Sequence, residues 1–286
     1  VPAGVFNVVP SSQASEIGKE FCENPGVRKL TFTGSTEVGR ILLRQAADQV
    51  MKCSMELGGN APFIVFDDAD LDAAVEGAMV AKYRNMGQTC VCTNRFYVQA
   101  GIHDAFVERL KEATAALVVG NGTEEGVSQG PLIDDGAVEK VEAMIADARA
   151  KGGVVVEGGH RHGNGGTFFE PTVITGATAA MQFARDEIFG PLAAVFRFDT
   201  EDEAIAAANA TEFGLAAYAY TRDLGRVFRL NERLEYGLIG INAGLITTVE
   251  APFGGLKESG MGKEGGSQGL DDYLVSKYVC LAGLGA

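Results

Sequence analysis

Segments that have the pattern of β-strands alternate with segments that have the pattern of α-helices along almost the whole chain. Residues 27–32 (VRKLTF) are strand-like, and residues 35–49 place apolar or small side chains at helical spacing. The alternation continues through strand-like residues 94–99 and 191–198, with a long amphipathic run over residues 137–153 between them. This rhythm predicts an α/β protein with mostly parallel sheets, because parallel strands need crossover connections that are usually helical.

Local signals predict where several of these elements begin and end. Asp70 is expected to cap a helix N-terminus, and Thr200 with Glu203 has the spacing of a capping box. The glycines that follow Lys151 predict the end of the long helix. Residues 271–281 (DDYLVSKYVCL) alternate in polarity and predict a final strand that pairs with another chain.

Composition narrows the classes of partner and compartment. The chain has 286 residues and a net charge of −14 without any run of Lys or Arg, which argues against nucleic acid or an anionic membrane as partner. Five cysteines in a chain of this size favour reduced thiols and a cytoplasmic location. No apolar run approaches the length of a membrane span. The first residues, VPAGVFNVVP, lack a methionine and are interpreted as the cut end of something longer.

Two cysteines lie two positions apart within residues 87–92 (GQTCVC). A metal site is disfavoured because the remaining cysteines and the three histidines offer no second pair at metal-binding spacing. A structural disulfide conflicts with a reducing compartment. Burial of Cys90 as a small apolar residue stays open, since unpaired cysteines are often buried. Its place in a Gly-Gln-Thr turn, after a helix that ends near Asn85, instead favours a nucleophile whose thiol pKa is pulled below about 8.5 by local dipoles.

Two further segments carry signals that allow more than one interpretation. Gly34 and Ser35 lie between an apolar strand and a helix, where backbone N–H groups can bind a phosphate, but the segment is not a Walker loop and also fits a plain tight turn. Glu56 stands between Met55 and Leu57 at a strand end, where burial would raise its pKa and make it a base. On local sequence alone, an exposed strand-end glutamate is the preferred interpretation of Glu56.

Five motifs occur in a specific order, and the order carries more information than any one of them. They are FTGSTEVG (32–39), MELGGN (55–60), GQTCVCTNR (87–95), DEIFGP (186–191) and APFGGLKESGMGKEGG (251–266). Together they resemble the aldehyde dehydrogenase superfamily over essentially all 286 residues. The paired cysteines, the preceding RNMGQ and the ending DDYLVSKYVCL look most like the succinate-semialdehyde dehydrogenases, with the glutarate-semialdehyde dehydrogenases as close relatives.

The resemblance implies a reaction and the residues that perform it. Cys90 matches the nucleophile that forms a thiohemiacetal with the aldehyde, from which a hydride passes to the nicotinamide and leaves a thioester. Glu56 matches the base that activates water to hydrolyse the thioester. Arg84, by local sequence a solvated helix arginine, matches a residue that contacts a substrate carboxylate, and Thr247 matches a serine position where an added methyl would trim the pocket. Cys92 is a candidate redox partner that forms a reversible disulfide with Cys90, with packing of a small side chain as the alternative.

The resemblance also implies a cofactor, NAD or NADP, and no metal. Gly34 and Ser35 match the positions under the cofactor pyrophosphate, and Leu57 matches one beside the nicotinamide. Glu187 matches the carboxylate that holds the nicotinamide ribose, with Phe189 close by.

The resemblance divides the chain into three parts and leaves several functions open. Residues 1–57 match the remaining half of a Rossmann-like NAD(P)-binding domain, residues 58–257 an α/β catalytic domain, and residues 258–286 a loop with an oligomerisation strand of a dimer or tetramer. The family's chains carry a further N-terminal portion, so the isolated chain is expected to bind its cofactor poorly. The alternatives are another aldehyde dehydrogenase, an inactive fragment that serves as a folding or oligomerisation unit, and a thiolate hydrolase of activated esters.

Overall fold

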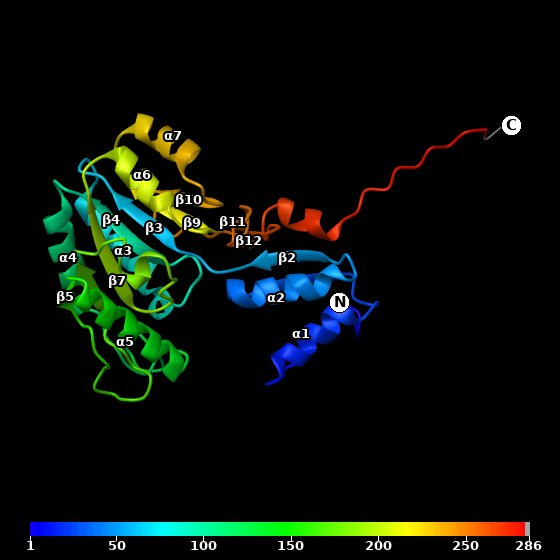
Figure 1. The fold of residues 1–286 in the computed structure, drawn as a ribbon, viewed down its shortest axis with the longest axis horizontal. Helices are drawn as coiled ribbons and strands as arrows, with labels where there is room; N and C mark the ends of the chain where they lie inside the picture. The colour runs from blue at the N-terminus through cyan, green and yellow to red at the C-terminus, as the bar shows by residue number, and fades with distance from the viewer. Residues whose placement is uncertain (284–286) are drawn as a thin grey trace.

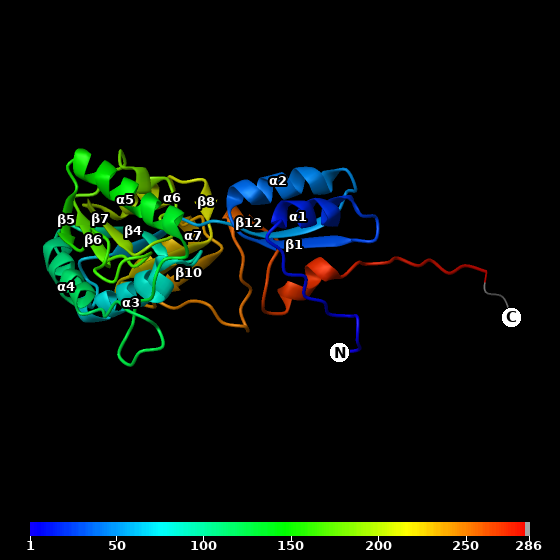
Figure 2. The same cartoon turned by 90° about the horizontal axis from the view of Figure 1, so that it is seen from below.

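The structure is a computed structural model that describes residues 1–283, and it consists of a large sheet with helices on both faces beside a smaller sheet (Figure 1). Seen from below, the large sheet and its helices form one body, and α1, α2 and β1 lie at its side (Figure 2). The expected α/β architecture is therefore confirmed. Among the described residues, no helix has the length and apolar character that crossing a membrane requires.

Within residues 1–283 the large sheet has seven strands, and six of them run parallel to one another. Only β5 and β6 pair in opposite directions. The strands, in their order across the sheet, are β10 (Leu238–Ile241), β9 (Ala216–Tyr220), β3 (Ala61–Val65), β4 (Thr93–Gln99), β7 (Leu192–Phe198), β6 (Thr172–Thr175) and β5 (Val154–Glu157).

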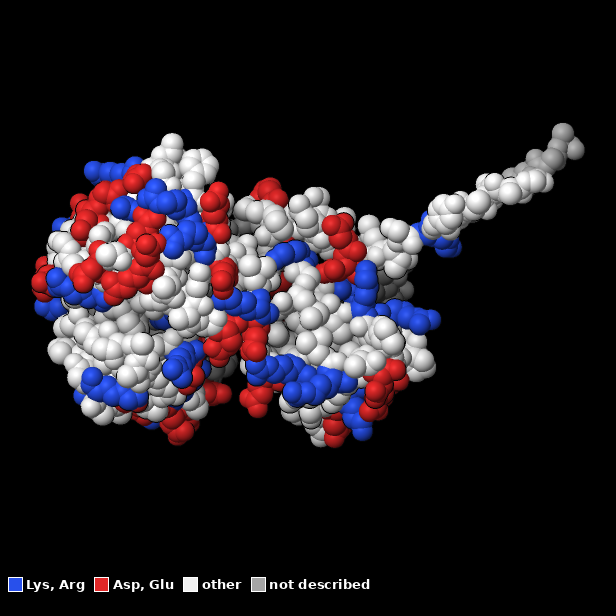
Figure 3. All heavy atoms as spheres, turned by 45° about the horizontal axis from the view of Figure 1, so that its top comes forward, with Lys and Arg blue, Asp and Glu red and all other residues white. Residues whose placement is uncertain are grey.

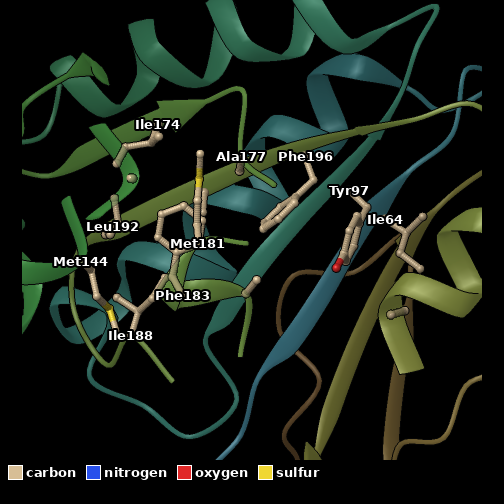
Figure 4. Close-up of a cluster of buried hydrophobic side chains, with 14 of the residues drawn as sticks. Ile64, Tyr97, Met144, Ile174, Ala177, Met181, Phe183, Ile188, Leu192 and Phe196 are labelled. Atoms are coloured by element: carbon tan, nitrogen blue, oxygen red, sulfur yellow. The ribbon is translucent and has the colours of Figure 1, made fainter. Parts of the chain in front are cut away.

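Both faces of this sheet are buried, because successive side chains of a strand point to opposite faces and each face is covered by helices. Phe63 and Val65 of β3 lie in the cluster that includes residues of α3 (Leu71–Tyr83) and α4 (His103–Ala115). Ile64, from the same strand, lies in the cluster shown in Figure 4, where it joins Tyr97, Phe196 and Met144. That second cluster packs under α5 (Asp135–Ala150), α6 (Glu201–Asn209) and α7 (Leu224–Arg233).

The predicted helix signals are confirmed in most of their details. The side chain of Asp70 accepts a hydrogen bond from the Ala73 N–H at 3.2 Å, as an N-cap does. Thr200 caps α6 by accepting from the Glu203 N–H at 3.3 Å, but the Glu203 carboxylate accepts from the Asp199 N–H, so the reciprocal half of the capping box is displaced by one residue.

The smaller sheet is built from both ends of the chain. Strand β1 (Lys29–Thr33) runs parallel to β2 (Lys52–Glu56), and the short β12 (Gly260–Met261) pairs with β2 in the opposite direction. Helices α1 (Ala14–Glu23) and α2 (Thr36–Ala47) pack on this sheet around Leu30, Leu42 and Met55. The two-stranded pair β8 (Phe213–Gly214) and β11 (Leu256–Lys257) connects the returning segment to the large body.

The expected final strand at residues 271–281 does not form within this single chain. Its first residues belong to a 3₁₀ turn, Gln268–Tyr273, and described residues 274–283 have no regular secondary structure and extend away from the body (Figure 1). A strand needs a neighbouring strand to satisfy its backbone N–H and C=O groups, and none lies beside this tail in the described chain. Sequence alternation predicted the extended shape but could not supply the partner.

Acidic and basic side chains are interspersed on the face seen in Figure 3. Acidic side chains also gather at the waist, the narrow region between the large sheet with its helices and the smaller sheet with α1 and α2. This face therefore carries both signs of charge, in a chain whose net charge is −14.

Candidate active site

The turn that carries the two cysteines follows α3 through a strained backbone segment. After α3 ends at Tyr83, Asn85 and Met86 adopt left-handed backbone angles, with φ of 53° and 57°. Gly87 has φ +73°, and a Cβ built on it would lie 2.1 Å from the Gly190 carbonyl oxygen. Only glycine permits this close contact, which joins the turn to the 186–191 motif. Left-handed non-glycine residues are costly and cluster at functional sites.

Cys90 and Cys92 are both half-buried free thiols with different surroundings. The Cys92 sulfur lies 2.6 Å from the Thr89 hydroxyl oxygen and 3.6 Å from the Lys82 carbonyl oxygen. Burial raises the pKa of the Cys90 thiol to about 11, and the charge of Glu187 adds to the effect. The expectation of a thiol pKa below about 8.5 is therefore wrong, because loss of solvent and neighbouring carboxylates outweigh the backbone dipoles.

Two glycines after β2 bring Cys90 and Glu187 to the same place. A Cβ on Gly59 would lie 2.4 Å from the Cys90 carbonyl oxygen, so the backbone of the cysteine packs directly against Gly59. The N–H of Gly59 donates to Glu187 Oε1 at 3.0 Å, and Glu187 Oε2 lies beside Gly58. Burial raises the pKa of Glu187, while this hydrogen bond favours its charged form.

Glu56, the last residue of β2, is buried at 3% exposure, so the preferred interpretation of an exposed strand-end glutamate is wrong. Neither carboxylate oxygen has a hydrogen-bond partner among the described residues. Burial, together with the charge of Glu264, raises the pKa of Glu56 to about 8. Gly254 lies against Glu56 Oε1, and the Lys263 ammonium donates to the Gly254 carbonyl at 2.9 Å. A carboxyl group with this pKa is suited to general base catalysis near neutral pH.

Asn94, which the sequence gave no reason to select, fixes the segment that contains Glu187. It is 2% exposed, and its side-chain oxygen accepts from the Ile188 N–H at 2.7 Å. Its amide group donates to the carbonyls of Phe183 and Asp186. Phe189 follows with φ of 48° and is partly exposed. The only available signal was the position of Asn94 at the start of β4, just after the cysteines.

Ser259 is a second residue that sequence reasoning missed. It is fully buried, donates to the Gly58 carbonyl at 2.7 Å and accepts from the Gly214 N–H at 2.9 Å. Its own carbonyl accepts from the Leu57 N–H at 2.9 Å. Ser259 therefore ties the C-terminal segment to the two glycines.

The Gly34–Ser35 segment lies beside the end of β2. The Gly34 N–H donates to the Glu56 carbonyl at 3.0 Å, and Ser35 caps α2 by accepting from the Val38 N–H. The Gly34 N–H is thus already used, and an anion here would have to bind the next N–H groups of the first turn of α2. Leu57 packs its side chain against Gly39 of α2. A cavity of about 180 Å³ opens at this place, lined in part by Thr36, Arg40 and Leu57.

Two of the predicted residues lie apart from these contacts. The side chain of Arg84 is exposed and makes no hydrogen bond or ion pair within residues 1–283, although its carbonyl oxygen lies 4.0 Å from the Cys92 sulfur. Thr247 is exposed in the loop after β10. That loop approaches α3 where Gly244 packs on Gly77. The structure therefore gathers Cys90, Cys92, Glu56 and Glu187, and it leaves Arg84 and Thr247 at the surface.

Comparison with known proteins gives a consistent result over nearly the whole chain. A model of the aldehyde dehydrogenase family matches residues 1–279. The chain is 62% identical over 284 residues to glutarate-semialdehyde dehydrogenase of Pseudomonas aeruginosa, covering 99% of this chain and 59% of that protein. It is 60% identical to 3-sulfolactaldehyde dehydrogenase of Pseudomonas putida, covering 99% of this chain and 58% of that protein.

The fold has close relatives among solved structures as well. The crystal structure of succinate-semialdehyde dehydrogenase from Burkholderia pseudomallei superposes with a TM-score of 0.95 at 58% identity, covering 98% of this chain and 59% of that one. The chain therefore spans a little under three fifths of the length of the relatives it matches.

Proposed function

The chain belongs to the aldehyde dehydrogenase family, and from that premise we propose that its protein oxidises an aldehyde with a terminal carboxylate, succinate semialdehyde first among them, to the acid with NAD(P)⁺. The observation that carries the proposal is the convergence of Cys90 and Glu187 on Gly58–Gly59, next to the buried Glu56. A nucleophile, a base and a further carboxylate thus meet where the two sheets join.

In the proposed mechanism, Cys90 gives its thiol proton to solvent, and the thiolate attacks the aldehyde carbon and forms a thiohemiacetal. The backbone N–H of Cys90 lies next to its own sulfur and donates to the developing oxyanion. Bound NAD(P)⁺ supplies the hydride acceptor. Loss of hydride from the thiohemiacetal carbon leaves a thioester on Cys90. Glu56 then takes a proton from water, the hydroxide adds to the thioester carbon, and the acid leaves with regeneration of the Cys90 thiolate.

The chain's residues fit a dinucleotide cofactor. Glu187 is held at Gly58–Gly59, where side chains larger than hydrogen would clash, and it is proposed to accept hydrogen bonds from the nicotinamide ribose. The cavity beside α2 lies next to Ser35 and Leu57. Ser35 is proposed to face the cofactor pyrophosphate, and Leu57 the nicotinamide. Gly34, which has no side chain, is proposed to let the pyrophosphate come close to the backbone. Phe189 is proposed to contact the ribose side.

The proposed substrate class rests on a chemical feature that the relatives' names share. Glutarate semialdehyde, succinate semialdehyde and 3-sulfolactaldehyde each join an aldehyde to an anionic group at the other end. Arg84 is proposed to bind that anion, because a guanidinium matches a carboxylate in a bidentate geometry. Thr247 is proposed to border the substrate pocket, where its methyl group would bear on the length of aldehyde that is accepted.

Cofactor binding, catalysis and oligomerisation are proposed to belong to different parts of the chain. Residues 1–57 would contribute half of the NAD(P)-binding domain, residues 58–257 the catalytic domain, and residues 258–286 an oligomerisation strand of a dimer or tetramer. All five cysteines are free, which supports a reducing compartment such as the cytoplasm. Cys92 is proposed as a redox partner of Cys90, and Cys92→Ala should then remove any peroxide inactivation that dithiothreitol reverses.

The function is tested by NAD(P)⁺ reduction with succinate semialdehyde, with glutarate semialdehyde and neutral butanal as comparisons. Cys90→Ala should abolish turnover. Glu56→Gln should release about one NAD(P)H per site in a burst and then turn over about 100-fold more slowly, because only hydrolysis needs the base. Arg84→Met should remove the preference for the anionic aldehydes over butanal.

Each alternative predicts a different result in the same assay. Ester hydrolysis by Cys90 without NAD(P)⁺, and without any aldehyde oxidation, would support the hydrolase. A folded chain without either activity would support the inactive fragment. Equal kcat/KM for butanal and succinate semialdehyde would contradict the proposed substrate class.

A further inference from the structure

Two buried side chains hold the backbone of the turn that carries Cys90. The hydroxyl of Tyr218, on β9, donates to the Val91 carbonyl at 2.7 Å. The ammonium of Lys82, on α3, donates to the Thr93 carbonyl at 2.9 Å. Both side chains are 1% exposed. With the Cys90 carbonyl packed on Gly59, three carbonyls within four residues are held by β9, by α3 and by the connection between β2 and β3.

The position of Lys82 is not explained by stability alone. In the described part of the chain its ammonium forms no ion pair and donates one hydrogen bond, to the Thr93 carbonyl. Burial of a charge with so few partners is unfavourable, and it lowers the pKa of Lys82 to about 8. The same ammonium lies within electrostatic range of Cys92 and Glu187, both of them in the gathered site. The unfavourable burial of the Lys82 charge therefore occurs beside the turn that carries Cys90.

We infer that Tyr218 and Lys82 are positioning residues that hold the backbone of the turn, so that Cys90 stays packed on Gly59, the residue whose N–H binds Glu187. The inference deepens the proposed function, since it rests on Cys90 as the nucleophile. Neither side chain touches the reacting atoms, so both act through the Val91 and Thr93 carbonyls.

The groups around the thiol fix the direction of the expected effect. Burial raises the pKa of Cys90 most, the charges of Glu187, Glu56 and Cys92 raise it further, and the N–H of Cys90 lowers it. When Tyr218 loses its hydroxyl, the Val91 carbonyl is left unsatisfied and the turn relaxes away from its present geometry. The thiol then becomes more exposed and moves away from Glu187, so its pKa falls. A fall of about one pKa unit raises the thiolate fraction at pH 7 about tenfold.

The test compares Tyr218→Phe with Tyr83→Phe in the 286-residue chain. Tyr83 is an equally buried control, 1% exposed, whose hydroxyl donates to the Thr172 carbonyl of β6 at 3.0 Å. The readout is alkylation of Cys90 by iodoacetamide at pH 7, with Cys90 and Cys92 distinguished by fragmentation mass spectrometry, alongside thermal unfolding. Tyr218→Phe should alkylate about tenfold faster than wild type, and Tyr83→Phe within about twofold of it, at similar losses of stability.

Equal alkylation rates for wild type and Tyr218→Phe would overturn the inference. If Tyr218→Phe does not fold, the alkylation rate of Cys90 in Lys82→Met is compared with wild type instead, and equal rates would again overturn the inference. Lys82→Met removes the other hydrogen bond while keeping an unbranched side chain. In protein that turns over, kcat should fall about tenfold with KM within about twofold, as expected for a misplaced nucleophile. Absence of wild-type turnover would contradict the proposed function, whereas the alkylation rates would still decide the role of Tyr218.

Discussion

A single methyl group at Gly59 should disable the site while leaving the fold in place. In Gly59→Ala the new Cβ would lie 2.4 Å from the Cys90 carbonyl oxygen, whereas ordinary contact begins at 3.4 Å. The contacted atom is backbone, so the turn has to move by about 1 Å to relieve the overlap. A displacement of that size at a reacting group lowers the rate about 100-fold, which corresponds to about 2.7 kcal/mol in activation free energy.

The matched control is Gly130→Ala, where a Cβ would meet no atom within 4 Å. Urea unfolding should show a loss of about 1–3 kcal/mol for Gly59→Ala, as is usual for overpacking. The kcat for aldehyde oxidation should fall about 100-fold in Gly59→Ala and stay near wild type in Gly130→Ala. The reasoning is refuted if Gly59→Ala folds and retains wild-type kcat, because the Cys90 carbonyl would then not be held against Gly59.

Further predictions concern the pH dependence that Glu56 confers and the buried side chains of Ser259 and Asn94. With a Glu56 pKa of about 8, single-turnover hydrolysis of the acyl-enzyme should speed up as the pH rises through about 8, and Glu56→Gln should remove that rise. Folding raises the pKa of Glu56 from 4.5, so its contribution to stability is complete below pH 4.5 and is lost as the pH rises to about 8; urea titrations of Glu56→Gln should therefore vary less with pH over this window. Ser259→Ala leaves the Gly214 N–H without an acceptor in the core and should lower the free energy of unfolding by about 1–3 kcal/mol, with exposed Ser276→Ala unchanged in the same titration. Asn94→Ala releases the Ile188 N–H and should weaken NAD(P)⁺ binding, measured by calorimetry, more than it lowers kcat at saturating cofactor.

Elements were predictable from the sequence wherever the signal was local. The alternation of apolar patterns predicted the parallel sheet, and the caps at Asp70 and Thr200 depend on residues only three apart. The strand predicted at 271–281 does not form within the single chain, because a strand is completed by a neighbour that its own sequence does not contain, and its pairing with another chain stays a prediction.

The candidate site was predictable in its chemical groups and less so in its surroundings. Cys90, Glu56 and Glu187 stand in ordered motifs, so their types and spacing were visible. The burial of Glu56 arises from residues near 254–264, some 200 positions away, and could not be seen locally. The raised pKa of Cys90 arises first from burial and then from the charge of Glu187, and only folding brings about both. Asn94, Ser259 and Tyr218 act through backbone carbonyls and amides that carry no sequence signature.

The base and the nucleophile are attached to different sheets. Glu56 ends β2 of the smaller sheet, Cys90 precedes β4 of the larger one, and the chain crosses between them at Gly58–Gly59. A rigid rotation of one part against the other would thus change the separation of the two groups without breaking a core in either. A substitution that changes only this rotation, and leaves the packing at Gly59 and Ser259 intact, should accordingly give protein that melts at a normal temperature, alkylates at a normal rate and yet accumulates as a stalled acyl-enzyme.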